Sequence, residues 1–230
     1  MAFESQSPEV VYMLHQINFQ TFFAELKSRL AQPLPGESAQ YKMAPARRLT
    51  LTDFYESGNK NPHRSAVLIC LYPHQQSIYT LLMLRPDEPG AHSGQISFPG
   101  GRFESHDVDL QATAIREARE EVGIQEKAVI IAGPLSPLYI PVSNHLVQPF
   151  VGFLEEKPFL LKNDHEVREI IETDILWLLD HSLKSSRTFP EFNFTSMEAP
   201  YYNLHGHHVW GATAMMLSEL EHLVREIINQ

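Results

Sequence analysis

Three glutamates within five residues are the strongest chemical signal in this sequence. Glu117, Glu120 and Glu121 lie in the run ATAIREAREEVGI, which follows the double glycine of FPGG. On a helix of 3.6 residues per turn, the three carboxylates lie along one face. Like charges at this spacing repel each other, so the common explanation, a solvated charged face, carries a cost in stability. Clustered carboxylates are also the ligands that Mg²⁺ and Mn²⁺ prefer, and these ions suit a phosphate-bearing substrate.

The segment around the glutamates resembles the Nudix box, which reads Gly, five residues, Glu, seven residues, then Arg-Glu-aliphatic-any-Glu-Glu-any-Gly-aliphatic. Residues 116–124, REAREEVGI, fit its second half. In the first half, five residues after Gly101 lead to Asp107 instead of glutamate, and eight residues separate Asp107 from Arg116. We therefore expect Asp107 to cap or brace the start of the helix, since its side chain can accept hydrogen bonds from free N–H groups there.

The aspartate with one extra residue is similar to the Nudix subgroup that cleaves coenzyme A. That subgroup has an upstream signature of Leu-Leu, Arg, His-x-Gly-Gln and Phe-Pro-Gly-Gly. The same residues occur here in order: Leu81, Leu82, Arg85, His92, Gly94, Gln95 and Phe98 to Gly101. The C-terminal run VWGATAMML is also similar to this subgroup, so the resemblance covers about residues 64–228.

The resemblance implies a role for each of these residues. Glu117 and Glu121 are the main ligands of Mg²⁺ or Mn²⁺, and Glu120 shares a metal or activates water. Arg116 orients the glutamates. The substrate side is formed by Arg85, His92, Gln95, Gly100 and Gly101. For the general base, Glu120 is the first candidate and Glu166, in NDHEVRE, is the second.

The implied reaction is hydrolysis of the diphosphate of coenzyme A or acyl-coenzyme A, giving 3′,5′-ADP and (acyl-)4′-phosphopantetheine. Two alternatives stay open. One is a Nudix hydrolase of another nucleoside diphosphate derivative, such as ADP-ribose or NADH. The other is a Nudix-like binding module without catalysis, although such a module would have no need of three intact carboxylates.

The elements that position these residues can be traced from apolar periodicity and capping residues. The glutamate helix is expected from about Leu110 to Val122, between a cap at Asp107 or Asp109 and Gly123. Two runs, at residues 66–72 and 78–85, predict a hairpin. Further strands are expected in residues 128–135, 145–154 and 166–172 and in HHVWG, with a short helix or turn at DILWLLD and a last helix from ATAMML onward.

This mixture of strands and helices predicts a layered α/β or α+β fold, and the resemblance implies a Nudix α/β/α sandwich with a mixed sheet. An added N-terminal helix is expected over residues 15–32. We divide the chain into an N-terminal helix with an extended connection, residues 1–62, and a Nudix hydrolase domain, residues 63–230. The added helix has two roles open to it: it covers the domain or it pairs two subunits in a homodimer.

Composition limits the partners and the location. The net charge of −10 argues against nonspecific nucleic-acid binding and leaves a small-molecule diphosphate as the expected partner. No apolar run reaches the ~18 residues of a membrane-spanning helix, so no membrane partner is expected. A single cysteine, Cys70, excludes an internal disulfide, and the N-terminus lacks a signal-peptide pattern. The expected location is therefore cytoplasmic.

Overall fold

A hairpin of apolar strands lies at the centre of the structure. The computed structural model describes residues 18–46, 51–56, 61–87, 92–190 and 196–229. Strands β1 (His63–His74) and β2 (Ser77–Leu84) pair antiparallel, as predicted. Gln75 and Gln76, the two residues between them, both have positive φ, 48° and 61°, the combination of a type I′ turn.

The hairpin belongs to a mixed sheet with the strand order β3-β2-β1-β7-β5. β1 and β7 run parallel, with His63 opposite His145, and the other pairs are antiparallel. Three more strands extend it, because β4 pairs with β1, β6 with β7 and β8 with β2. The bounds of these strands are β3 (Ile96–Ser97), β4 (Gly100–Arg102), β5 (Ile130–Pro134), β6 (Leu138–Ile140), β7 (His145–Phe153) and β8 (Glu169–Asp174).

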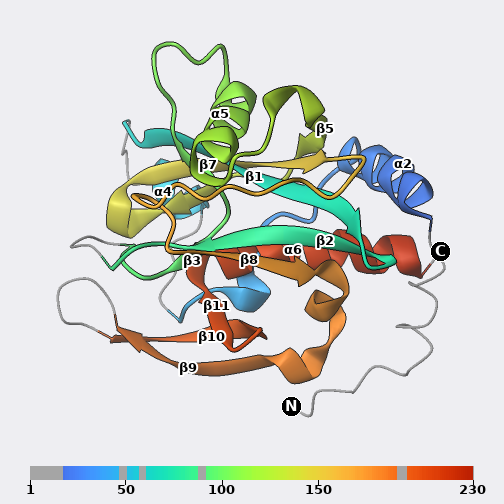
Figure 1. Cartoon of the computed structure of the whole chain (residues 1–230). Helices are drawn as coiled ribbons and strands as arrows, with labels where there is room; N and C mark the ends of the chain where they lie inside the picture. The colour runs from blue at the N-terminus through green and yellow to red at the C-terminus, as the bar shows by residue number, and fades with distance from the viewer. Residues whose placement is uncertain (1–17, 47–50, 57–60, 88–91, 191–195, 230) are drawn as a thin grey trace.

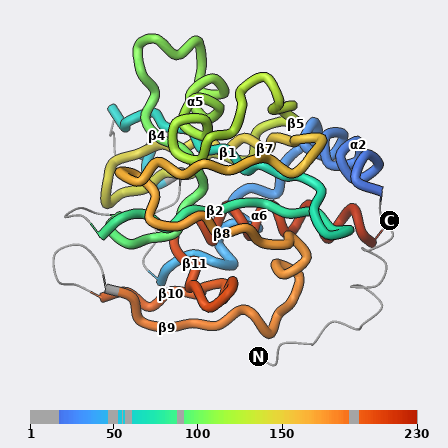
Figure 2. The backbone as a smooth tube through the Cα atoms, viewed as in Figure 1, coloured from blue at the N-terminus to red at the C-terminus, as the bar shows by residue number. Residues whose placement is uncertain are grey.

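Helices cover both faces of this sheet. The alternation of β1 side chains places Leu68 and Cys70 in one core with α5 (Leu110–Val122). Ile69 and Leu71 point to the other core, which includes α2 (Phe19–Leu30) and α6 (Gly211–Ile228). Figures 1 and 2 show α5 and α6 on opposite sides of the sheet. The predicted α/β/α sandwich with an added N-terminal helix is confirmed.

The added helix α2 covers the domain. Asn18 caps it by accepting a hydrogen bond from the Gln20 amide at 2.8 Å, and its buried side chains, Phe22, Leu26 and Leu30, join the core that contains α6. Arg29 donates to Glu226 of α6 at 2.7 Å. Subunit pairing, the other role predicted for this helix, is not needed to bury its apolar side chains.

The connection after α2 is not extended throughout, because its described part contains three short helices: α3 (Glu37–Gln40), η1 (Tyr41–Met43) and α4 (Leu51–Glu56). A buried carboxylate on α6 anchors the first of them. Glu219 accepts hydrogen bonds from the Gly36 amide at 3.1 Å and from Gln40 Nε2 at 2.9 Å. Polar anchoring of this kind leaves no apolar periodicity in the sequence, and the prediction missed these helices for that reason.

A second, three-stranded antiparallel sheet follows in the order β11-β10-β9. Its strands are β9 (Lys184–Pro190), β10 (Ser196–Leu204) and β11 (His207–Trp210). Only β11 was predicted, since β9 has the polar sequence KSSRTFP. The remaining elements are short: η2 (Glu126–Ala128), η3 (Pro141–Ser143), η4 (Ile175–Leu179) and η5 (His181–Leu183). Across the described ranges, no helix combines the length and apolar character that crossing a membrane requires.

Candidate active site

Helix α5 holds the glutamates in a fixed orientation. It begins after Asp109, whose side chain accepts the Ala112 amide at 2.8 Å, and it ends at Gly123, which has φ 77°. Of the two predicted caps, Asp109 is therefore the one used. The apolar side of the helix, formed by Ala114, Ala118 and Val122, packs into the core on β1. The helix presents Glu117 and Glu121 to the double glycine of β4, as the contacts below show.

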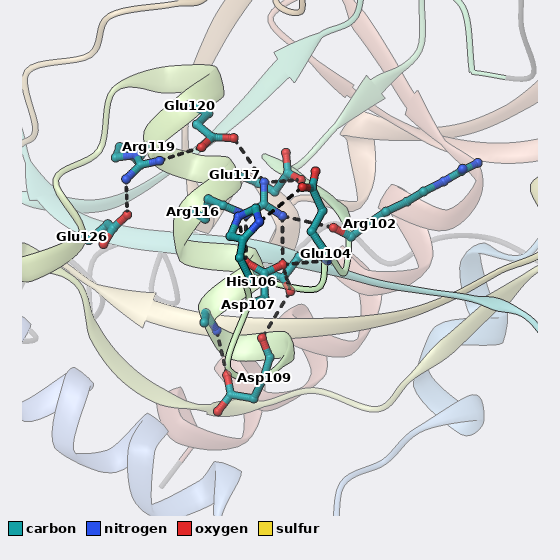
Figure 3. Close-up of polar contacts among 12 residues, drawn as sticks. Arg102, Glu104, His106, Asp107, Asp109, Arg116, Glu117, Arg119, Glu120 and Glu126 are labelled. Carbon is teal, nitrogen blue, oxygen red and sulfur yellow. Dashed lines mark hydrogen bonds and ion pairs between the residues drawn. The ribbon is translucent and has the colours of Figure 1, made fainter.

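Arg116 braces the loop before α5 through Asp107 (Figure 3). Its Nε and Nη2 donate to the two oxygens of Asp107 at 2.8 and 3.0 Å, and Nη2 also donates to the Arg102 carbonyl at 3.1 Å. Asp107 further accepts the Glu104 amide and the Thr113 hydroxyl, both at 2.9 Å. The bonds from Arg116 hold the pKa of Asp107 well below its usual range, although burial acts in the opposite direction. Asp107 is thus a brace and not the cap.

The third nitrogen of Arg116 contacts two of the box glutamates. Nη1 donates to Glu117 Oε1 at 2.9 Å and to Glu120 Oε2 at 3.1 Å, as an orienting role requires. Glu120 also accepts from Arg119 Nη2 at 2.6 Å. Two guanidinium groups therefore hold the Glu120 carboxylate, as Figure 3 shows.

The double glycine allows the glutamates to lie against the sheet. Gly100 donates its amide to Glu121 Oε2 at 2.8 Å. A Cβ atom on Gly101 would lie 2.3 Å from Glu117 Oε1, and one on Gly100 would lie 2.4 Å from the Ala66 carbonyl oxygen. Gly100 has no room for a side chain because the close atoms belong to the backbone, whereas a side chain at position 101 would have to displace the Glu117 carboxylate.

The charge of Glu117 and Glu121 is poorly compensated. Glu121 is only 3% exposed, and burial raises its pKa to about 8, with a further contribution from the charge of Glu117. Burial also raises the pKa of Glu117, against the lowering effect of Arg116. The charge of Glu166, on the turn before β8, raises the pKa of both carboxyl groups. A cation between these groups would stabilise their charged forms.

The glutamates fit a divalent metal only in part as they are placed. In the part of the chain that the structure describes, no three His, Cys, Asp or Glu side chains are grouped closely enough to enclose an ion. Glu120 is held by Arg116 and Arg119. Glu117 and Glu121 offer all-oxygen ligands beside the glycine turn, and such ligands suit Mg²⁺ and Mn²⁺. Of the three predicted ligands, Glu117 and Glu121 are thus placed so that they could hold a metal, and Glu120 would have to leave its arginines to join them.

A cavity of about 590 Å³ adjoins the glycine turn. Two short strands line it, β3, which pairs with β2, and β4, which pairs with β1. The five residues predicted to face the substrate all line this cavity: Arg85, His92, Gln95, Gly100 and Gly101. The structure thus brings together residues spread over seventeen positions in the sequence, and the double glycine is shared between the cavity and the glutamate helix.

The predicted polar residues of the cavity have distinct surroundings. His92 lies within hydrogen-bond distance of Gln95 Oε1, at 3.1 Å, and of the Ser143 hydroxyl, at 3.0 Å, and burial lowers its pKa. Arg85 makes no side-chain hydrogen bond or ion pair with the described residues. Arg85 lines the cavity, and its charge lowers the pKa of both Glu121 and His92.

Sequence reasoning missed several other residues that line the cavity, among them Ser65, Arg102, His145, Met197 and Trp210. Ser65 and His145 are 80 positions apart, and the parallel pairing of β1 with β7 brings them together. No motif connects them in the sequence. Arg102 directly follows the double glycine, so its position beside that motif was the one available signal.

Comparison with known proteins agrees with the geometry. The sequence model of the NUDIX domain matches residues 62–192, which is more than half of the chain. The chain belongs to the Nudix hydrolase family. This confirms the enzyme class predicted from the glutamate motif, and the divalent-metal requirement is general to that family. Membership of the family does not by itself define the subgroup or the substrate of this chain.

Two curated Nudix relatives illustrate the similarity. Nudix hydrolase 22, chloroplastic, from Arabidopsis thaliana is 30% identical over 198 residues, which are 79% of this chain and 63% of the relative. The uncharacterized Nudix hydrolase NudL of Photorhabdus laumondii is 32% identical over 171 residues, covering 73% of this chain and 87% of the relative. The chain therefore spans less than two thirds of the Arabidopsis protein and most of the bacterial one.

Among solved structures, a MutT/nudix family protein from Enterococcus faecalis matches with a TM-score of 0.49 and 15% identity. The match covers 97% of this chain and 76% of that protein.

Proposed function

We propose that the chain hydrolyses the diphosphate bond of coenzyme A or acyl-coenzyme A, giving 3′,5′-ADP and (acyl-)4′-phosphopantetheine. The observation that carries this proposal is the common cavity. The signature residues Arg85, His92 and Gln95 line it together with the double glycine, and Glu117 and Glu121 contact that same glycine turn. The glutamates themselves are not among the described residues that line the cavity, so in this proposal the diphosphate lies at the double glycine, which Glu117 and Glu121 approach.

The wall of the cavity supports a substrate with a long, partly apolar arm. Its lining includes Val142, Met197, Trp210 and Met216 beside the polar residues. Apolar walls with a few placed polar groups are typical of small-molecule sites. The pantetheine arm of coenzyme A, or an acyl chain on it, would bury apolar surface there, and ADP-ribose has no such arm.

We propose a separate role in the reaction for each of the charged residues near the glycine turn. Glu117 and Glu121 would hold Mg²⁺ or Mn²⁺, and a bound metal polarises a phosphoryl group and lowers the pKa of a bound water. Arg116 keeps the Glu117 carboxylate in place through the 2.9 Å bond. Arg85 supplies positive charge beside Glu121, where the diphosphate would lie.

For the general base, the contacts favour Glu166 over Glu120. Two guanidinium groups hold Glu120, so each of its carboxylate oxygens already accepts a hydrogen bond from an arginine. Glu166 is exposed, and its side chain makes no hydrogen bond with the described residues. Its charge reaches both Glu117 and Glu121. Glu166 is therefore the better-placed proton acceptor in this proposal.

The test is a substrate panel with Mg²⁺ or Mn²⁺: coenzyme A, acyl-coenzyme A, dephospho-coenzyme A, ADP-ribose and NADH, with products identified by mass. We expect coenzyme A or its thioester to give the highest kcat/KM. Faster cleavage of ADP-ribose or NADH would contradict the proposal and support the alternative substrate class. Tight binding without cleavage of any compound would support a binding module. The cytoplasmic location and the homodimer stay predictions.

A further inference from the structure

We propose that Arg102, held in position by His145, binds a second anionic group of the substrate, separate from the diphosphate. In coenzyme A this group is the 3′-phosphate. This inference rests on the proposed function for the identity of the group. It assigns to Arg102, which no motif singled out, the selectivity for substrates that carry a phosphomonoester.

The backbone of Arg102 is fixed relative to the glutamate helix. The residue is paired with Ser65 in the β1–β4 ladder, and its carbonyl oxygen accepts a hydrogen bond from Arg116 Nη2 at 3.1 Å. The Arg102 side chain points away from this contact with Arg116. Figure 3 shows it extending away from Glu117 and Glu120, and it lines the cavity. A group bound by this side chain would thus lie at a set distance from the metal ligands.

His145 holds the Arg102 side chain by its innermost nitrogen. Arg102 Nε donates to His145 Nε2 at 3.3 Å, and His145 Nδ1 lies 2.7 Å from the Ser65 hydroxyl. Because a guanidinium group only donates, His145 Nε2 must be the acceptor, and Nδ1 carries the proton that it donates to Ser65. Burial, together with the charge of Arg102, lowers the pKa of His145 to about 4, so the ring stays neutral at pH 7 and can keep this role.

The outer nitrogens of Arg102 stay available to a ligand. Among the described residues, Arg102 has no acidic partner, and neither Nη1 nor Nη2 makes a hydrogen bond. A guanidinium group in this state presents paired N–H donors that match two oxygens of a phosphomonoester. The side chain is exposed at the mouth of the cavity, where a terminal phosphate can stay partly hydrated.

Arg85 is the competing cation, and its surroundings favour a different task. Its charge lowers the pKa of Glu121, so Arg85 lies close to the glutamates and suits the diphosphate. Arg102 instead donates to His145, and its side chain extends away from Glu117 (Figure 3). In this proposal Arg85 and Arg102, the arginines among the described residues of the cavity wall, bind two different anionic groups.

The experiment compares coenzyme A with dephospho-coenzyme A, which lacks only the 3′-phosphate. We expect Arg102→Ala to raise the KM for coenzyme A about tenfold or more, the range of a charge-assisted hydrogen bond, and to leave kcat and the KM for dephospho-coenzyme A nearly unchanged. Arg85→Ala should impair both substrates. Arg64→Ala is the matched control, because Arg64 lies on β1 with its guanidinium 4.8 Å from the Phe103 ring and does not line the cavity. Equal impairment of both substrates by Arg102→Ala would overturn the inference.

A binding assay separates this inference from the proposed reaction. Calorimetric titration with 3′,5′-ADP and with 5′-AMP should show a preference for 3′,5′-ADP that Arg102→Ala abolishes. This result would support the inference even if coenzyme A were not hydrolysed, and the absence of any preference would overturn it even if coenzyme A were hydrolysed.

The positioning role of His145 has its own test. His145→Ala should raise the KM for coenzyme A by less than Arg102→Ala, and should add little in the double variant, since both changes remove one interaction. His145→Gln retains an acceptor and should restore part of the affinity. Additive effects of the two single variants would show that His145 does not act through Arg102.

Discussion

Two buried carboxylates beside the same helix, Asp107 and Glu121, have opposite surroundings. Asp107 accepts hydrogen bonds from the Arg116 guanidinium, a backbone amide and a hydroxyl group, and its pKa lies well below the usual range. Glu121 accepts one backbone amide, from Gly100, and burial raises its pKa to about 8. The residues are of similar type and burial, so the partners make the difference.

This difference distinguishes a carboxylate that stabilises the fold from one that is available to a ligand. A buried carboxylate whose oxygens are all satisfied stabilises the fold and offers nothing to a ligand. A buried carboxylate beside another carboxylate, with little compensation, costs stability until a cation arrives. Strongly perturbed titrating groups in a cleft are characteristic of active sites for this reason. Asp107 is therefore the brace, and we propose that Glu121 binds the metal together with Glu117.

The largest effect is expected from Glu121→Gln. The change keeps the shape and removes one charged ligand, so kcat/KM should fall about a thousandfold, given the several kcal/mol that a metal contributes. Thermal melting of the metal-free protein near pH 7 should be nearly unchanged, because a carboxyl group whose pKa is about 8 is mostly protonated there and glutamine is likewise uncharged. Steady-state kinetics and calorimetry measure both. Glu156→Gln on the exposed surface is the control, and retention of a tenth of the activity by Glu121→Gln would remove Glu121 from the metal site.

The next effect concerns the general base. Glu166→Gln should lower kcat about a hundredfold, the usual contribution of general acid–base catalysis, while Glu120→Gln should lower it less. A stopped-flow or steady-state comparison of the two variants at saturating metal decides the order. A more severe loss with Glu120→Gln would return the role of base to Glu120, the first candidate from the sequence.

Asp107→Asn should lower the stability of the fold more than it lowers the catalytic rate. The change leaves Arg116 without its main counter-charge in a site where the Asp107 side chain is 2% exposed. Breaking one partner of a buried pair costs on the order of 3 kcal/mol, which denaturant unfolding would detect. Thr113→Val removes one hydrogen bond to the same carboxylate and serves as the milder comparison. If Asp107→Asn keeps full stability but loses metal affinity, Asp107 is a ligand and the contrast with Glu121 fails.

Gly101→Ala should give the smallest of these effects. The new Cβ would meet the Glu117 carboxylate at 2.3 Å, so the flexible end of Glu117 must shift. We expect an increase of about tenfold in the metal concentration for half-maximal activity, comparable to the loss on disturbing a metal's supporting residues. Gly206→Ala is a matched control because a Cβ there meets nothing within 4 Å, although its φ of 83° adds some strain. An unchanged metal requirement would show that Glu117 does not need its present position.

The sequence predicted the elements that carry the glutamates with good accuracy. Asp109 and Gly123 mark the ends of α5 because caps act through local backbone groups, and the apolar alternation of β1 and β2 defined the hairpin. The substrate residues were also placed together, since they come from one continuous segment.

The sequence did not show which partner each charged side chain would contact. Glu120 lies at the spacing of a ligand, yet two neighbouring arginines hold it. Asp107 was a candidate cap, but its side chain accepts a hydrogen bond from Arg116, nine positions later, and does not cap the helix. The contact between Arg102 and His145 depends on β1 pairing with both β4 and β7, and such long-range pairing leaves no local periodicity.

The most direct test of the account is a titration of the protein with Mn²⁺ across pH, with free Mn²⁺ followed by electron paramagnetic resonance. A metal must displace the proton of a carboxyl group whose pKa is about 8, so affinity should rise from pH 6 to pH 8 and level off above. Glu121→Gln should bind weakly and lose this pH dependence, and Glu156→Gln, a change at an exposed position, should match the unmodified protein. Equal, pH-independent affinity in Glu121→Gln and the unmodified protein would contradict the assignment of Glu121 as a metal ligand.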